Sequence, residues 1–336
     1  MVKAINNALA EWEQSHDAVS DRVYQVTMVG NPTMRDIFFG VSVSSLGVIP
    51  FQPQSTEAVE RAPSELGLRV NPAARVYGGP LIGGHAGADA VADVLASGLG
   101  RGDKVSMVVD IGTNGEVVVG NRDKMLAASC AAGGAYEGAT VGCGVGALQG
   151  AITNIVLDDG HARYETIGGK PPVGICGSGL IDLLSELLRT GAMTRGGKLA
   201  APDKEFLVDG AVGIVFTQED VHNLMVARAG MSLDQKALLE RWGITSTDLE
   251  RVYLAGAFGN YVNARSAARI GLLPDLPDRT VKLGNAALEG ARLMLLSEAK
   301  RREAEDLARR IEYIRPNEDQ AFFDALVDRM CFEAWR

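Results

Sequence analysis

Three strand-like segments follow one another closely in this chain, joined only by tight turns. They cover residues 105–110, 116–120 and 124–129, and each is largely apolar. Asn114-Gly115 lies between the first two segments, and this dipeptide is typical of hairpin turns. The sequence therefore predicts three antiparallel strands in immediate succession. After them, strand-like and helix-like segments alternate, which predicts an α/β fold.

The first turn carries the residues best suited to bind a ligand. Backbone N–H groups in a glycine-containing turn can point outward and bind phosphate oxygens, and glycine lets the backbone approach closely. Hydroxyl and amide side chains add further hydrogen-bond donors. We therefore predict a phosphate-binding turn made of Gly112, Thr113, Asn114 and Gly115.

Carboxylates stand on both sides of this turn. Asp110, at the end of the first strand, is placed to hold Mg²⁺ through water or to orient an attacking water. Glu116 follows the turn. Asp110 and Glu116 are the candidate catalytic residues, and Asp110 is also the candidate metal ligand. The alternative for so short a pattern is an ordinary hairpin with an aspartate at a strand end.

A second glycine pair follows a short apolar segment at 252–255 and precedes a predicted helix at 261–270. At such a strand–helix turn the backbone can pass flat against a base or ribose, and the helix N-terminus favours an anion. A glycine pair that serves only packing is the alternative. The predicted cofactor-binding residues of this turn are Gly256, Ala257, Phe258, Gly259 and Asn260.

Other glycine-rich and serine-containing patterns favour structural roles. No Walker A motif is present, which disfavours a P-loop NTPase. Gly142-x-Gly144-x-Gly146 does not follow a clear strand, which disfavours a dinucleotide-binding fold. Ser178 is predicted to cap a helix at 180–188. Ser232-x-x-Gln235 is predicted as a capping box that opens a helix to Trp242, separate from a helix at 218–228.

Composition excludes several classes of protein. The formal net charge is −9 and the pI is near 5.1, so we expect no nucleic-acid partner. No run of about 18 apolar residues occurs, so we expect no membrane span. The four cysteines form no C-x-x-C pair, which favours a reducing compartment and a cytoplasmic location over a disulfide-stabilised or zinc-binding protein.

Taken together, these motifs resemble the C-terminal domain of the reductive activators of corrinoid proteins. That family is a branch of the actin, sugar-kinase and heat-shock-chaperone ATPase superfamily. The resemblance covers nearly the whole chain and is carried by four stretches: 29–34 (VGNPTM), 109–116 (VDIGTNGE), 175–182 (ICGSGLID) and 255–261 (AGAFGNY).

The resemblance implies an actin-like ATPase fold with RNase-H-like lobes of mixed sheets flanked by helices. Residues 1–103 would be the remainder of a first lobe, and 104–336 a second lobe with C-terminal helices. It also implies ATP and Mg²⁺ as cofactors. Residues 110–115 would be the second phosphate loop, 256–259 the adenosine loop and 284–296 a connecting helix.

The resemblance further implies a function. Family members use ATP to drive electron transfer from a [2Fe–2S] domain to cob(II)alamin, which regenerates cob(I)alamin for methyltransferases. The expected partners are a corrinoid protein or corrinoid methyltransferase and a second copy of the chain. The [2Fe–2S] domain and the first phosphate loop are expected outside this sequence, leaving the first lobe incomplete. Two alternatives stay open: a non-catalytic docking module of the same fold, and a small-molecule kinase.

Overall fold

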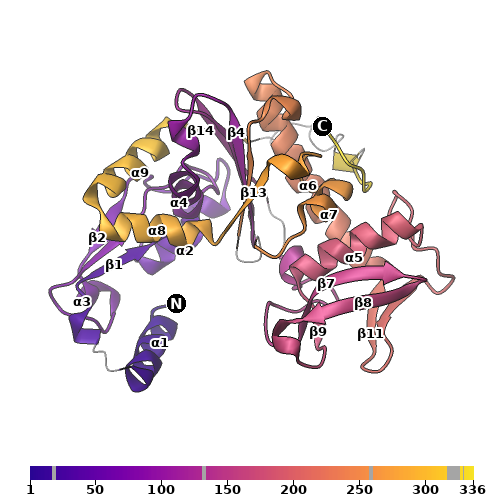
Figure 1. Ribbon diagram of the computed structural model, residues 1–336. Helices are drawn as coiled ribbons and strands as arrows, with labels where there is room; N and C mark the ends of the chain where they lie inside the picture. The colour runs from indigo at the N-terminus through magenta and orange to yellow at the C-terminus, as the bar shows by residue number, and fades with distance from the viewer. Residues whose placement is uncertain (17–19, 131–133, 257–259, 316–325, 328) are drawn as a thin grey trace. The chain divides into compact units, whose positions relative to one another are not determined.

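The computed structural model describes all residues except 17–19, 131–133, 257–259, 316–325 and 328 (Figure 1). The chain forms two compact units. Unit 1 contains Met1–Asp103, Gly120–Ala127 and Ala286–Tyr313, and unit 2 contains Lys104–Val119, Ala128–Asn285 and Ile314–Arg336. Unit 1 thus includes two later segments of the chain as well as residues 1–103.

Unit 1 is built around a three-stranded sheet. Its order is β1 (Gln25–Met28), β3 (Arg75–Gly78) and β2 (Val59–Arg61), with β1 parallel and β2 antiparallel to β3. The helices α1 (Val2–Ser15) and α2 (Pro32–Phe38) contribute apolar side chains to its core. The Asn31 side chain accepts a hydrogen bond from Met34 N, which caps α2 with Pro32 in its first turn.

The other helices of unit 1 pack closely. They are α3 (Pro63–Leu66), α4 (Ala88–Ser97), α8 (Ala286–Leu296) and α9 (Glu298–Arg310). A β-carbon on Gly290 would lie 2.2 Å from Ala92 O, so α8 approaches the backbone of α4 where only glycine fits. After α9, strand β14 (Ile311–Tyr313) pairs in parallel with the first residues of β6 (Met125–Cys130).

Unit 2 contains the strands that the sequence predicted most clearly. They are β4 (Ser106–Ile111), β5 (Gly115–Gly120) and the end of β6, which are neighbours in one sheet. β12 (Val252–Ala255) pairs in parallel with β4 on one side and with β13 (Thr280–Gly284) on the other. Every residue of β5 is buried, so this sheet has apolar cover on both faces.

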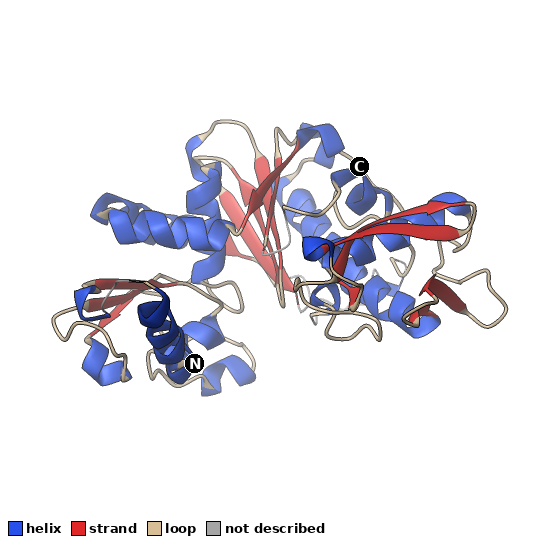
Figure 2. Cartoon of the chain, turned by 60° about the horizontal axis from the view of Figure 1, so that its bottom comes forward, coloured by secondary structure: helices blue, strands red, loops and turns tan. Residues whose placement is uncertain are grey.

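A second group of elements in unit 2 lies between β6 and β13 in the sequence. Figure 2 shows the long pair of strands β7 (Ala151–Asp158) and β8 (His161–Thr166), which are antiparallel. The short β9 (Gly174–Ile175) pairs with β7, and β10 (Glu205–Asp209) pairs with β11 (Ile214–Thr217). The helices are α5 (Gly177–Thr190), α6 (Gln218–Trp242) and α7 (Ala264–Arg269).

The prediction that Ser178 caps a helix is wrong. α5 begins at Gly177, and the N-cap position is held by Cys176. Ser178 is fully buried in the first turn, and its hydroxyl donates to Thr153 O at 2.8 Å. The Ser178 hydroxyl therefore donates to a backbone carbonyl of β7, whereas the local sequence predicted that it caps the helix backbone.

The predicted break before Ser232 is also wrong. α6 runs without interruption for 25 residues, and its capping box consists of Thr217 and Asp220. Ser232 and Gln235 are both buried, and their side chains bond elsewhere: the hydroxyl donates to Ala229 O, and the amide donates to Leu272 O at 2.8 Å. Burial in the middle of a helix explains these polar residues better than capping.

All four cysteines are free thiols. Of the helices in the described part of the chain, none has the length and apolar composition needed to cross a bilayer.

Candidate active site at the edge of the parallel strands

The two predicted nucleotide motifs meet at one edge of the unit 2 sheet. Asp110, near the end of β4, is the register partner of Ala255, the last residue of β12. Ala255 in turn pairs with Gly284, the last residue of β13. Because the three strands are parallel, their carboxyl ends open on the same side. In open α/β sheets, ligands bind outside these carboxyl ends.

Gly256 is the residue of the second motif that contacts the first. It is buried and has a φ of +108°, a conformation that favours glycine. A β-carbon there would lie 2.5 Å from Ile111 O and 2.8 Å from Asp110 Oδ1. The half-buried Asp110 carboxylate therefore lies directly against the backbone of the second motif.

The turn after Asp110 is closed by its own backbone. Gly112 N donates to Asn114 O at 3.0 Å. Thr113 is exposed, and its hydroxyl donates to Glu137 Oε2 at 2.7 Å. Glu137 is a second carboxylate beside the predicted phosphate turn. No local motif marks it, because the contact joins two loops that are separated by β5 and β6.

Gly115 has a packing reason to be glycine. A β-carbon there would lie 2.9 Å from Met231 Cε and 3.1 Å from Cys130 Sγ. Glu116 follows it on β5 and is only 6% exposed. Side chains of α6 and β6 thus pack against this turn, and this packing fixes the backbone that would face a phosphate.

An ionisable group lies buried on α6 near the same turn. Burial raises the pKa of Asp234 to about 7, and a hydrogen bond from the Cys130 thiol partly opposes this shift. The pKa of Cys130 is itself raised, mainly by burial and then by the charges of Asp234 and Glu116. Asp234 was not among the predicted residues, because an aspartate within a helical pattern gives no local sign of burial.

The last described residue of the second motif, Asn260, reaches the end of β13. A β-carbon on Gly284 would lie 2.4 Å from Asn260 Nδ2, and Lys282 Nζ donates to Asn260 O at 3.2 Å. Ala257, Phe258 and Gly259 lie outside the described residues. Lys282 and Gly284 join the edge through tertiary pairing that no sequence motif indicates.

The glycines at 142–146 have structural roles. Gly144 lies against Gly138, where added β-carbons would come within 2.6 Å of backbone atoms, and Gly142 N donates to Asp220 Oδ1. The next regular element is the strand β7, whereas a dinucleotide motif opens a helix.

The edge offers the ligand types that a magnesium nucleotide needs. Mg²⁺ is usually held by one or two carboxylates together with phosphate oxygens and water. Asp110 and Glu137 supply carboxylates, and the turn at Gly112 supplies backbone N–H groups. Within the described residues, no three His, Cys, Asp or Glu side chains cluster as a complete metal site.

Comparison with known proteins places these features in a family. The model for the C-terminal domain of RACo, the ASKHA domain, matches residues 104–335, and the model for the RACo middle region matches residues 1–102. ASKHA denotes the superfamily of actin, sugar kinases and heat-shock chaperones. The matched ranges together cover nearly the whole chain.

Individual relatives agree. The chain is 36% identical over 300 residues to the corrinoid activation enzyme RamQ of Eubacterium limosum, covering 82% of this chain and 50% of the relative. It is 27% identical over 323 residues to the [Co(II) methylated amine-specific corrinoid protein] reductase of Methanosarcina barkeri, covering 86% and 59%. The chain thus spans about half the length of the curated relatives it matches.

A solved structure supports the same assignment over the full length of the chain. The reductive activator for corrinoid, iron–sulfur protein superposes with a TM-score of 0.92 at 32% identity, covering 99% of this chain and 56% of that one. The mixed sheets flanked by helices are therefore those of the predicted actin-like ATPase fold. The chain belongs to the RACo family of reductive activators of corrinoid proteins.

Proposed function

We propose that this chain is the nucleotide-binding part of a reductive activator of corrinoid proteins. The observation that carries the proposal is the meeting of Asp110 and Gly256 at the carboxyl edge of β4, β12 and β13. The relatives' names support the wider role, since one is a corrinoid activation enzyme and another a reductase of a Co(II) corrinoid protein.

The residues at this edge have distinct roles in the proposal. The backbone N–H groups of Gly112 to Gly115 donate to phosphate oxygens, and the Thr113 hydroxyl exchanges its hydrogen bond to Glu137 for one to a phosphate oxygen when the nucleotide binds. Asp110 holds Mg²⁺ directly or through water, and Glu137 adds a second carboxylate nearby. Gly256 leaves room for the nucleoside, and Asn260 closes the far side at β13. Glu116 is the second candidate catalytic group and acts from its buried position on β5.

In the whole protein, ATP binding or hydrolysis would drive the reduction of cob(II)alamin to cob(I)alamin. The electron would come from a [2Fe–2S] domain, which is not a part of this sequence. The proposed partners are a corrinoid protein or its methyltransferase, with the activator as a homodimer in the cytoplasm. A nucleotide can shift such a protein between two states only by its differential affinity for them, so nucleotide binding by this chain is the first requirement.

The test is isothermal titration of the purified chain with MgATP, comparing wild type, Asp110→Ala and Asp203→Ala. Asp203 is an exposed aspartate of the same unit and serves as the matched control. We expect saturable binding by the wild type and by Asp203→Ala, and a loss of at least about tenfold in Asp110→Ala, the size of one charge-assisted contact. A folded wild-type chain that binds no MgATP would instead support the docking-module alternative.

A further inference from the structure

A small hollow in unit 2 lies apart in the sequence from both nucleotide motifs. It has a volume of about 220 Å³ and is formed by the second half of α6, the segment after it and the C-terminal residues. Its lining contains three cationic side chains and one anionic side chain: Lys236, Arg329, Arg336 and Glu240. An excess of positive charge is unusual in a chain whose net charge is −9.

The C-terminal wall of this hollow is firmly held. Trp335 is 8% exposed, and its indole Nε1 donates to Gly271 O at 3.1 Å. The buried Arg228 guanidinium donates to the carbonyls of Arg329 and Cys331. A pocket whose walls are fixed in this way is preformed, which lowers the entropy that a ligand must lose on binding.

Lys236 is the main cation of the hollow. Its Nζ lies 4.9 Å from the centroid of the Trp335 ring, and within the described part of the chain no carboxylate forms an ion pair with it. Arg336, by contrast, is paired with Asp275 at 3.0 Å. A partly buried ammonium without a carboxylate is stabilised when an anion binds next to it.

The charges around Lys236 support this view. Burial lowers the pKa of Lys236 to about 8, and the nearby guanidiniums of Arg329 and Arg228 lower it further in the same direction. Glu240 and Glu333 act in the opposite direction but more weakly. Among the described residues, the surroundings of Lys236 therefore hold more positive than negative charge.

Ser246 is a polar residue in the wall of the hollow. It lines the hollow, is only 1% exposed, and its hydroxyl oxygen has no hydrogen-bond partner among the described residues. The neighbouring Thr245 hydroxyl, in contrast, donates to Asp248 at 2.9 Å. Buried hydroxyls are nearly always hydrogen-bonded, so Ser246 is an unsatisfied group, but its oxygen is closed to solvent and does not contact a ligand in the hollow.

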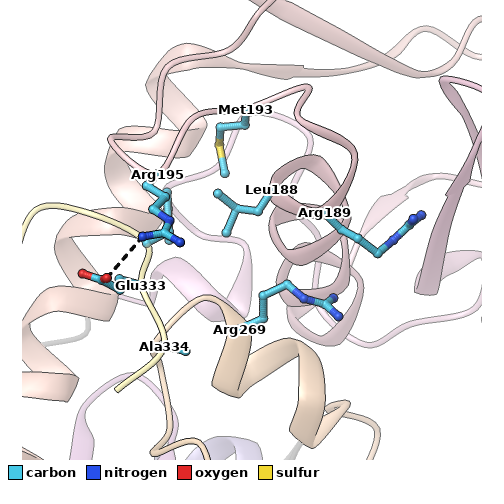
Figure 3. Close-up of a pocket in the computed structure, with 8 residues that line it drawn as sticks. Leu188, Arg189, Met193, Arg195, Arg269, Glu333 and Ala334 are labelled. Carbon is cyan, nitrogen blue, oxygen red and sulfur yellow. Dashed lines mark hydrogen bonds and ion pairs between the residues drawn. The ribbon is translucent and has the colours of Figure 1, made fainter. Parts of the chain in front are cut away.

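A larger hollow of about 340 Å³ in the same unit also has cationic side chains, but they are paired. Figure 3 shows its three arginines, of which Arg195 pairs with Glu333 at 3.3 Å. Arg189 pairs with Glu186 at 2.7 Å, and Arg269 donates to Ser185 Oγ at 2.6 Å. Each guanidinium there already has a hydrogen-bond or ion-pair partner within the chain. A bound anion would therefore stabilise those arginines less than it would stabilise Lys236.

We propose that the smaller hollow binds a small anion, a carboxylate or phosphate of few atoms, through Lys236 and Arg329. Leu239, Ile244 and the Trp335 ring provide an apolar wall for a short carbon chain. The volume is below that of pockets for drug-sized ligands, which excludes a nucleotide. This site is separate from the nucleotide site at Asp110.

The experiment is isothermal titration of the whole chain with inorganic phosphate and, separately, with propionate, at constant ionic strength set with NaCl. The variants are Lys236→Gln and Arg329→Gln. The controls are Ser246→Ala and Lys198→Gln, of which the second removes an exposed lysine of the same unit. Ser246→Ala removes a hydroxyl without a partner, so it leaves no buried group unsatisfied.

We expect one saturable site, with affinity about tenfold or more weaker in Lys236→Gln, severalfold weaker in Arg329→Gln and unchanged in Ser246→Ala. Lys198→Gln should bind as the wild type does. Tighter binding of phosphate identifies a phosphate ligand, and tighter binding of propionate a carboxylate. Affinity should also fall as the pH rises through about 8, because Lys236 then loses its charge.

Absence of saturable binding for both anions, or equal affinity in wild type and Lys236→Gln, would overturn the proposal. Asp110→Ala should keep the anion site intact, because Asp110 does not line this hollow. The two proposals therefore fail independently: loss of MgATP binding leaves the anion result unaffected, and the reverse also holds.

Discussion

Asp110 Oδ1 lies 2.8 Å from the position that a β-carbon on Gly256 would occupy. The two residues are far apart in sequence and are brought together because β4 and β12 pair in parallel, with Asp110 opposite Ala255. The backbone at Gly256, directly after β12, thus lies against the Asp110 carboxylate near the end of β4. A nucleotide held at this edge would contact both strand ends at once, which no single loop could provide.

Replacing Gly256 tests whether this close approach matters. Gly256→Ala should lose about 2–4 kcal/mol of stability and at least about tenfold in MgATP affinity, because alanine is strained at a φ of +108° and collides with Ile111 O. Urea unfolding and calorimetry measure the two effects.

Gly243 is the matched control for this change. Its φ is +89°, but no atom lies within 4 Å of a β-carbon there. Gly243→Ala should therefore cost only the backbone term, about 1 kcal/mol, and leave MgATP binding unchanged. Equal effects of the two substitutions would show that the contact with Asp110 is unimportant.

Two helical glycines predict opposite responses to alanine. Gly290→Ala should destabilise unit 1 by about 1–3 kcal/mol, since its β-carbon would lie 2.2 Å from Ala92 O on α4. Gly230→Ala in α6 should stabilise unit 2 by about 0.5–1 kcal/mol, because the nearest atom, Cys130 Cβ, is 4.0 Å away and alanine favours the helix. Thermal unfolding of both variants gives the comparison, and a stabilised Gly290→Ala would refute the tight α4–α8 contact.

Asp234 should make stability depend on pH. Burial raises the folded-state pKa of Asp234 from its ordinary 3.8 to about 7, so the folded chain binds this proton more tightly than the unfolded chain does. This contribution to stability is fully present below pH 3.8 and is lost as the pH rises through about 7, with a total of about 4 kcal/mol.

Asp234→Asn should remove this loss of stability with rising pH, because asparagine does not ionise. Urea unfolding at pH 5 and pH 8 should show a smaller fall in stability for this variant than for the wild type. Asp203→Asn, at an exposed position, should show the wild-type fall. If Asp234→Asn falls as steeply as the wild type, another group causes the dependence.

Much of the secondary structure around the site follows from local patterns. The strands β4, β5 and β6 lie within one residue of their predicted bounds. Hairpin residues and apolar segments act over a few neighbours, so the sequence alone reveals them. Errors arose where a polar residue bonds to a distant partner, as Ser178 does with Thr153 and Gln235 with Leu272.

The sequence by itself determined the α/β class, the hairpin turn after Asp110 and the glycine after β12 at Gly256, because these depend on turn geometry and local apolar periodicity. Tertiary structure alone decided that the two turns share one edge, that Gly284 and Asn260 complete it and that Glu137 bonds to Thr113. It also joined the C-terminal α8 and α9 to unit 1 and brought Lys236 and Arg329 together in the small hollow. These arrangements depend on strand register and on burial between distant segments, and neither leaves a local pattern in the chain.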